Sequence, residues 1–303
     1  MKKRTVSVVI SAWNEERNIR RCLSSVTWAD ELIVIDNFST DRTEQIAKEF
    51  TTRIWKRPNN LMLNVNKNYG FEKATGDWII SLDADEEIPA QLKKEIQDSV
   101  RSQDIAGFWI PRKNIIFGKW IMHGLWWPDR QLRMFRRGLG SFPEKHVHEY
   151  LDVQGKTENL REPYVHYNYE TISQFIRKMD TIYTESEVQK LISSSYQMSW
   201  RDAIRFPFSD FIKIYFAQSG YKDGLHGLVL ALLQSFYSFV VFAKLWERQK
   251  FSDIPVTSAM TTGEAMHAGK EYSYWDLTAQ IKETTNPLRI LWLKIKRRYR
   301  GAP

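Results

Sequence analysis

The acidic run at residues 83–87 (DADEE) is the part of this sequence best suited to chemistry. It follows the apolar segment 78–82 (WIISL), which has the pattern of a buried β-strand, so the carboxylates emerge where that strand ends. Adjacent acids repel one another unless solvent or a cation relieves the repulsion. Two carboxylates, water and a substrate diphosphate together complete an octahedral shell around Mg²⁺ or Mn²⁺. The alternative is a charged turn whose carboxylates cap a helix.

A second polar cluster, 36–41 (DNFSTD), follows the apolar segment 32–36 (LIVID). In one interpretation it is a strand–helix turn that supplies a helix N-cap. In the other, Asp36 accepts a hydrogen bond from an N–H of a nucleotide base, while the nearby helix N-terminus favours phosphate. The two interpretations are compatible with each other.

Strands and helices are expected to alternate along the first 110 residues, and they must hold the two polar clusters in place. Strands are expected at 6–11, 32–36, 53–56 and 78–82, and helices at 14–26, after 41, at 64–74 and after 89. Short strands that alternate with helices indicate an α/β fold with a parallel, doubly wound sheet. Ligands bind outside the carboxyl ends of the strands in such sheets, which is where the polar clusters fall.

Beyond residue 107 the pattern changes. Residues 107–170 read as aromatic and basic loops, 171–250 as helices, and 251–286 as a polar, weakly patterned stretch. A single cysteine, Cys22, among 303 residues excludes an internal disulfide framework and a Cys-rich zinc site. The charged and apolar fractions are 26% and 43%, which exclude a disordered chain.

Three segments, in this order, resemble glycosyltransferase family 2, whose members are inverting enzymes of the GT-A fold: 6–16 (VSVVISAWNEE), 33–43 (IVIDNFSTDRT) and 66–87 (NKNYGFEKATGDWIISLDADEE). Residues 123–137 (HGLWWPDRQLRMFRR) and 145–149 (KHVHE) resemble the branch that builds lipopolysaccharide core and related bacterial surface glycans. The resemblance covers residues 5–250 and implies a Rossmann-like, mainly parallel sheet flanked by helices, followed by a helical C-terminal extension.

The resemblance also assigns the donor site. The residues it implies for nucleotide-sugar binding are Ala12, Asn14, Glu16, Asp36, Lys67 and Asp83. Asp36 is expected to meet the base, and Lys67 to lie near the phosphates. Asp85 is the implied ligand of Mg²⁺ or Mn²⁺, with Asp83 on the ribose or the metal. Ala12-Trp13 stands where the family has Pro-Tyr, and Lys67 replaces an arginine, so it lacks a bidentate fork.

Inversion at the anomeric carbon needs a carboxylate that takes the proton of the acceptor hydroxyl. By the resemblance, Asp129 occupies the place of this catalytic base, and Glu149 is its rival. The alternative for Asp129 is an ion pair with Arg130 or Arg133.

Other residues of this region have two interpretations each. His148 is either a further metal or phosphate ligand or a structural histidine. Arg130, Arg133 and Arg136 either steady phosphate or an anionic acceptor, or form an exposed basic stripe.

The positive charge lies in the second part of the chain. Residues 1–110 hold 16 Lys/Arg against 17 Asp/Glu, whereas residues 111–303 hold 28 against 19. The second part also contains the apolar run 227–243 and the basic, amphipathic tail 287–300. The apolar run is a buried helix, an in-plane membrane helix or a short span. Together with the tail it favours a monotopic protein that binds anionic lipid on the cytoplasmic face of the inner membrane.

These observations predict three regions: a nucleotide-sugar-binding half (1–110), an acceptor and catalytic region (111–170), and a helical, membrane-associating region (171–303). The expected function is metal-dependent transfer of a sugar from a nucleotide-diphosphate sugar to a membrane-associated glycolipid or polysaccharide. The expected donor is a UDP-sugar. One alternative is transfer onto polyprenyl phosphate, which needs no base. A distant alternative is a basic nucleic-acid-binding protein, which the acidic clusters disfavour because they repel phosphate, so no nucleic-acid partner is expected.

Overall fold

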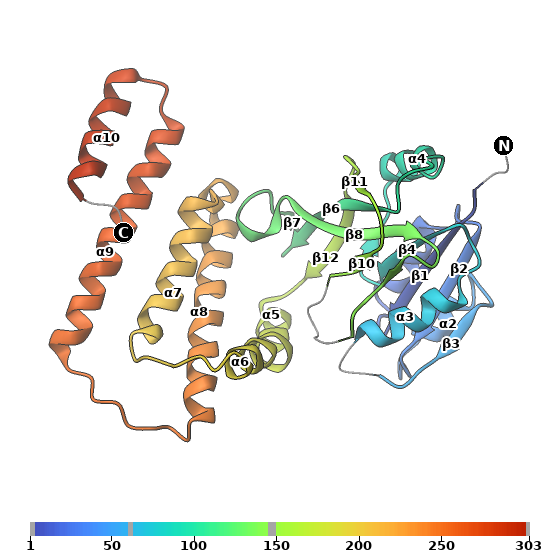
Figure 1. The fold of residues 1–303 in the computed structure, drawn as a ribbon, viewed down its shortest axis with the longest axis horizontal. Coiled ribbons are helices and arrows are strands. Elements are labelled where there is room, and N and C mark those ends of the chain that lie inside the picture. Colours follow the sequence, from blue (N-terminus) through green and yellow to red (C-terminus); the bar gives the residue numbers. More distant parts are fainter. Residues whose placement is uncertain (1–3, 60–62, 145–149, 301–303) are drawn as a thin grey trace. The chain divides into compact units, whose positions relative to one another are not determined.

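The computed structural model describes residues 4–59, 63–144 and 150–300. The chain divides into two compact units: Met1–Ile116 with Trp127–Asn168, and Phe117–Trp126 with Tyr169–Pro303. The first unit holds a β-sheet with its covering helices, and the second is almost entirely helical (Figure 1). The expected α/β class with a helical C-terminal extension is confirmed.

Four parallel strands form one half of the sheet. In spatial order they are β3 (Ile54–Lys56), β2 (Glu31–Asp36), β1 (Val6–Ala12) and β4 (Trp78–Asp83). The ladders pair Ala12 with Asp36 and Ser11 with Asp83. This register brings the ends of β1, β2 and β4 level with one another, so the polar residues that follow them share one edge of the sheet.

The other half of the sheet is largely antiparallel. Its strands, in spatial order after β4, are β8 (Asp129–Arg136), β6 (Gly107–Ile116), β12 (Tyr164–Tyr169) and β5 (Glu86–Glu87). The short β11 (Thr157–Asn159) pairs with β6, and β9 (Gly140–Ser141) pairs separately with β10 (Asp152–Val153). The expectation of loops across 107–170 is therefore wrong. Buried polar residues such as Asn114, Arg133 and His166 interrupt the apolar pattern of these strands.

Helices cover both faces of the parallel half. The helices of the first unit are α1 (Ile19–Ser25), α2 (Thr43–Ala47), α3 (Leu63–Lys73) and α4 (Ala90–Ser99). Val8 and Ile10 of β1 join the core shared with α1, α2 and α4, whereas Val9 joins the core shared with α3. Helix α3 approaches closely because Gly70 has no side chain: a Cβ there would lie 2.4 Å from Val9.

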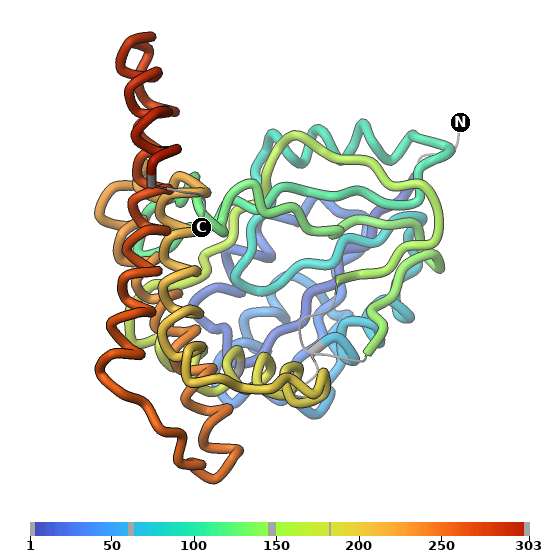
Figure 2. Tube along the Cα trace, turned by 60° about the vertical axis from the view of Figure 1, so that its left-hand side comes forward, coloured from blue at the N-terminus to red at the C-terminus, as the bar shows by residue number. Residues whose placement is uncertain are grey.

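The second unit is a row of packed helices (Figure 2). They are α5 (Ile172–Lys178), α6 (Thr184–Ser193), α7 (Asp202–Ile212), α8 (Leu225–Arg248), α9 (Ser258–Glu283) and α10 (Pro287–Arg300). Helix α8 packs along α7, α7 contacts α9, and α10 packs on α9. Helix α9 occupies most of the stretch that sequence patterning left without an element. Within the described part of the chain, α8 alone is long and apolar enough to cross a membrane.

Candidate active site

Asp36, at the end of β2, is completely buried, and only one of its two carboxylate oxygens has a hydrogen-bond partner among the described residues. Its Oδ1 accepts a hydrogen bond from the backbone N–H of Ser39 at 3.2 Å. Its Oδ2 is buried and has no hydrogen-bond partner among the described residues. Leaving a buried acceptor unpaired costs free energy. The position therefore suits a bound molecule that donates an N–H, as nucleotide bases do.

Asn14 and Glu16 join the loop after β1 to the loop after β2. The backbone N–H of Thr40 donates to Asn14 Oδ1 at 2.8 Å, and Arg42 Nε donates to Glu16 Oε2 at 3.2 Å. Asn14 adopts a φ of +54°, which asparagine tolerates better than most residues. Ala12 is buried where β1 ends. These residues shape the edge beside Asp36, and their contact with a nucleotide stays a prediction.

A partly buried ion cluster lies where β4 ends: the Asp83 side chain is 32% exposed, whereas Arg133 and Glu86 are buried. Lys67 Nζ is 2.5 Å from Asp83 Oδ1, and Arg133 Nη2 donates to Asp83 Oδ2 at 2.8 Å. The same Arg133 nitrogen donates to Glu86 Oε1 at 2.6 Å, and Glu86 is completely buried. Lys67 comes from α3 and Arg133 from β8, so helix and antiparallel strand both supply cations to the acidic motif.

The pKa values of the two carboxyl groups in this cluster are shifted in opposite directions. Burial would raise the pKa of Asp83, but the nearby charges of Lys67 and Arg133 outweigh burial and hold that pKa far below its usual range. Burial raises the pKa of Glu86, and Arg133 offsets only part of this effect. Asp83 is therefore ionised at neutral pH, and two cations already balance its charge.

Asp85 faces a histidine that the sequence did not single out. His166 Nε2 is 3.5 Å from Asp85 Oδ2. The strand pairing explains this placement, because β12 aligns His166 with Glu86 and the backbone N–H of Tyr167 donates to the Asp85 carbonyl at 3.0 Å. The other ring nitrogen of His166, Nδ1, lies 2.8 Å from Oδ1 of the buried Asn114. An amide oxygen accepts, so Nδ1 donates its hydrogen to Asn114, and Nε2 is the ring nitrogen that faces Asp85.

Asp85 and His166 are candidates to hold a divalent cation. No cluster of three or more His, Cys, Asp or Glu side chains that could hold a metal occurs among the described residues. Asp85 and His166 nevertheless offer one carboxylate oxygen and one imidazole nitrogen, and diphosphate and water would supply the other ligands. Asn114 would act as the outer partner that fixes the orientation of the imidazole. The first acid of the motif, Asp83, is engaged by Lys67 and Arg133 instead.

Asp129 opens β8 and is held by three side chains. Arg112 approaches its Oδ2 with Nε at 2.7 Å and Nη2 at 2.5 Å. Asn114 Nδ2 donates to the same oxygen at 3.2 Å, and Gln131 Nε2 donates to Oδ1 at 2.7 Å. The ion pair considered in the sequence analysis therefore exists, but with Arg112, which β6 places directly opposite Asp129. Asn114 thus bonds on one side to Asp129 and on the other to His166.

The three arginines of β8 have separate partners. Arg130 Nη1 donates to the Leu160 carbonyl at 3.0 Å, and Arg136 Nε donates to the Ile105 carbonyl at 2.7 Å. Arg133 lies in the ion cluster. Their contact with phosphate or acceptor stays a prediction. His148 and Glu149 lie outside the described residues.

The ion cluster predicts a large loss of stability when its arginine is removed. Arg133→Met would leave the completely buried Glu86 without its cation and Asp83 with Lys67 alone. Breaking a buried pair costs about 3–5 kcal/mol in the free energy of unfolding. Urea denaturation followed by circular dichroism at pH 7 measures this loss. The exposed Arg101, changed to Met, is the matched control and should shift stability by no more than about 0.5 kcal/mol. Equal effects of the two changes would contradict the structural role of Arg133.

Comparison with known proteins relates part of the chain to one family. The model of the family described as Glycosyl transferase family 2 matches residues 7–151. The lipopolysaccharide core biosynthesis glycosyltransferase LpsC of Rhizobium meliloti (strain 1021) is 24% identical over 262 residues, which cover 84% of this chain and 96% of the relative. An uncharacterized glycosyltransferase of Rickettsia typhi is 28% identical over 261 residues, covering 82% of this chain and 88% of the relative.

Two solved structures are also similar to this chain. TarS 1-349 of S. aureus in complex with UDP-GlcNAc has a TM-score of 0.43 and 16% identity, and the match covers 81% of this chain and 92% of TarS. Glucosyl-3-phosphoglycerate synthase from Mycobacterium tuberculosis in complex with Mg²⁺ and UDP has a TM-score of 0.41 and 20% identity. This match covers 65% of this chain and 81% of the synthase. Residues 7–151 are therefore the part of this chain that matches glycosyl transferase family 2, and the relatives with the longest matches are named as glycosyltransferases.

Proposed function

We propose that this chain transfers a sugar, with inversion, from a nucleotide-diphosphate sugar to a membrane-associated glycolipid or polysaccharide. The observation that carries the proposal is the unpaired Oδ2 of the buried Asp36, at the sheet edge that also holds Asp83. An unpaired carboxylate oxygen calls for an N–H donor, and uracil has one on its ring. We therefore propose a UDP-sugar as the donor.

In this proposal the diphosphate lies toward the acidic motif. Asp85 and His166 would hold Mg²⁺ or Mn²⁺ there, and the cation would stabilise the charge of the departing nucleoside diphosphate. Lys67, whose ammonium is already at Asp83, lies close enough to this motif to contact a phosphate oxygen. Asp83 itself, balanced by Lys67 and Arg133, is suited to accept a ribose hydroxyl hydrogen bond.

Asp129 is the proposed base for the transfer step. The acceptor oxygen bonds to the anomeric carbon as the bond from that carbon to the diphosphate oxygen breaks, and the hydroxyl proton passes to the Asp129 carboxylate. Arg112, Asn114 and Gln131 restrict the orientation of this carboxylate. Because Asn114 also bonds to His166, one buried amide orients the proposed base and the proposed metal ligand together.

The proposed acceptor class rests on the relative from R. meliloti, whose name places it in lipopolysaccharide core biosynthesis, and on helix α10. One side of α10 packs on α9 through the buried Leu293, and Arg297 donates to Thr278 Oγ1 at 3.0 Å. The large apolar residues exposed on α10 are Leu288, Leu291, Trp292, Ile295 and Tyr299. They recur every three or four residues, and cations flank them on the same helix.

An apolar stripe between cations is the pattern of a helix that lies in an anionic lipid surface. We therefore propose that the protein binds the cytoplasmic face of the inner membrane, where anionic headgroups give the leaflet a negative potential. Such binding would bring the donor site to an acceptor that is itself held by lipid.

The catalytic assignment predicts distinct kinetics for two carboxylate variants. With Mn²⁺ and a UDP-sugar identified by thermal shift, Asp129→Asn should lower kcat by about 10²–10⁴-fold because the proton acceptor is lost. Donor affinity should change little, since Asp129 is not assigned to the donor site. The exposed Asp152, changed to Asn, is the control. The same assay on Glu149→Gln tests the rival base.

The outcomes of this assay separate three functions. A crippled Glu149→Gln with an active Asp129→Asn would reverse the assignment of the base. Full activity of both variants with a polyprenyl phosphate acceptor would favour the alternative in which a phosphate oxygen attacks without a base. No thermal shift with UDP-, GDP- or TDP-sugars would contradict the donor class itself.

The tail predicts salt-dependent binding to lipid. The chain should co-sediment better with anionic than with neutral vesicles, and deletion of 287–303 should weaken this binding because up to about 1 kcal/mol is lost for each cation near the surface. The difference should shrink at high salt. A matched variant with Lys93, Lys94 and Arg101 changed to Gln lowers the charge elsewhere and should bind normally. Equal sedimentation with both lipids, unchanged by the deletion, would exclude α10 as a lipid contact.

A further inference from the structure

Helix α8 is apolar on its exposed face as well as on its buried face, which includes Leu230, Val241 and Leu245. Its polar side chains bond to neighbouring helices: Ser235 Oγ donates to the Pro207 carbonyl at 2.8 Å, and Ser238 Oγ donates to the Asp210 carboxylate. Its exposed large apolar residues are Leu225, Leu232, Phe236, Phe239 and Trp246. A surface helix in water ordinarily turns its apolar face inward. In α8 the two serine hydroxyl groups bond to α7, and large apolar side chains lie on the exposed face in addition to those that are buried.

The exposed apolar residues form one continuous stripe. Their spacings of three, four and seven residues place them on one face of a helix. Leu232, Phe236 and Phe239 at the centre are 52%, 49% and 42% exposed, and only 28% of the most apolar window of the helix is buried. At 1.5 Å per residue the stripe from Leu225 to Trp246 is about 32 Å long. This is a large apolar surface to leave in water.

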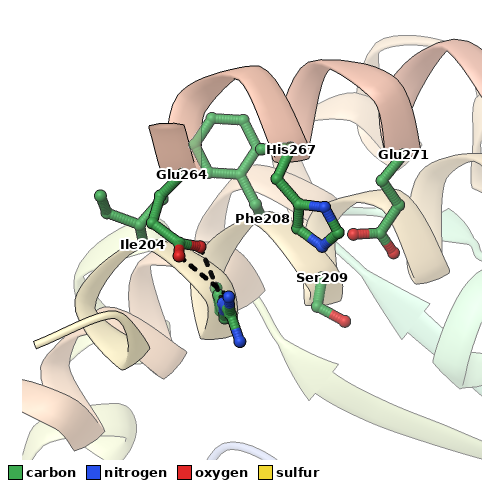
Figure 3. Close-up of a pocket in the computed structure, with 8 residues that line it drawn as sticks. Ile204, Phe208, Ser209, Glu264, His267 and Glu271 are labelled. Carbon is green, nitrogen blue, oxygen red and sulfur yellow. Dashed lines mark hydrogen bonds and ion pairs between the residues drawn. The ribbon is translucent and has the colours of Figure 1, made fainter. Parts of the chain in front are cut away.

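The opposite face of α8 makes a full crossing of the membrane unfavourable. That face packs on α7, where Arg205 pairs with Glu264 of α9 through contacts of 2.8 and 2.9 Å (Figure 3). Figure 3 also shows His267 and Ser209 at a small cavity of about 150 Å³ between α7 and α9. A spanning α8 would carry these charged and polar groups into hydrocarbon, where each is costly. Only the outer stripe of α8 is suited to lipid.

Charge identifies lipid, rather than a second copy of this chain, as the occupant. From Leu225 through Ala243 the helix has no Asp, Glu, Lys or Arg, which matches hydrocarbon. The tail helix α10 of the same unit holds six cations and no acid. A second copy carries the same positive charge and is repelled by it, whereas an anionic bilayer attracts it.

We propose that α8 lies parallel to the bilayer surface, with the stripe Leu225, Leu232, Phe236, Phe239 and Trp246 in the acyl-chain region and the opposite face on α7. The segment is thus an in-plane anchor rather than a span or a core helix. This inference does not depend on the transferase chemistry. It adds a second apolar contact to the one proposed for α10, and two weak anchors together bind more firmly than either alone.

Depth measurement by site-specific labelling tests the proposal. In the full chain with its single cysteine removed (Cys22→Ala), Leu232→Cys, Phe236→Cys and Phe239→Cys each carry an environment-sensitive fluorophore. Thr262→Cys, exposed on α9, is the control. Anionic vesicles with lipids brominated at defined depths should quench all three α8 labels at the same shallow depth and leave the control unquenched. A depth that changes steadily from 232 to 239 would show a span, and absence of quenching would overturn the proposal.

Two variants without a fluorophore test the same stripe by vesicle binding, so that the result does not depend on labelling. Leu232→Glu and Phe236→Glu place a charge on the outer stripe, where the side chain is already half exposed, so the thermal midpoint should stay near that of the parent. Vesicle binding should fall at least about tenfold, because a carboxylate is excluded from hydrocarbon and repelled by anionic lipid. Unchanged vesicle binding would overturn the proposal. So would a parent that forms dimers without lipid and loses them on these substitutions, since the stripe would then be an interface between copies.

Discussion

The arrangement of the first unit depends on one buried guanidinium, that of Arg133, between Asp83 and Glu86. Glu86 is completely buried beside the partly buried Asp83, and without a cation the cost of removing its charge from water would be unopposed. The arginine reaches them from β8, which pairs antiparallel with β4 and aligns Ile80 with Met134. The same pairing fixes β6 beside β8, and β6 supplies Arg112 and Asn114. The antiparallel half of the sheet therefore completes the acidic motif that the parallel half presents.

Because Arg133 binds Asp83 and Glu86 but not Asp85, the three acids have different surroundings. Asp83 is held ionised by Lys67 and Arg133, and Glu86 keeps a raised pKa because burial dominates its surroundings. Asp85 lies outside this ion cluster and faces His166. Asn114 links His166 to Asp129, so a proposed metal ligand and a proposed base are oriented by one amide. The three acids of residues 83–86 therefore have separate roles, and they do not all bind one cation.

The parallel half of the fold could be predicted from sequence, and the antiparallel half could not. Strands such as β2 and β4 read as continuous apolar runs, so their ends located Asp36 and Asp83. Strands β6, β8 and β12 carry Asn114, Arg133 and His166 at buried positions, and these polar residues hide the strand pattern. His166 is a metal-site candidate only because β12 aligns it with Glu86, a pairing between residues 80 positions apart. Helix α9 escaped prediction because its apolar residues show little helical periodicity.

The central proposal is that Asp85 and His166 hold the divalent cation of a nucleotide-sugar site, beside an ionised Asp83 whose charge is balanced by Lys67 and Arg133. Electron paramagnetic resonance of Mn²⁺ titrated into the protein with UDP present measures this affinity directly and without turnover. We expect Asp85→Asn and His166→Gln each to weaken Mn²⁺ binding at least about tenfold, while the exposed Asp152, changed to Asn, leaves it unchanged. Mn²⁺ affinity that stays at the parent value in both site variants would contradict the account.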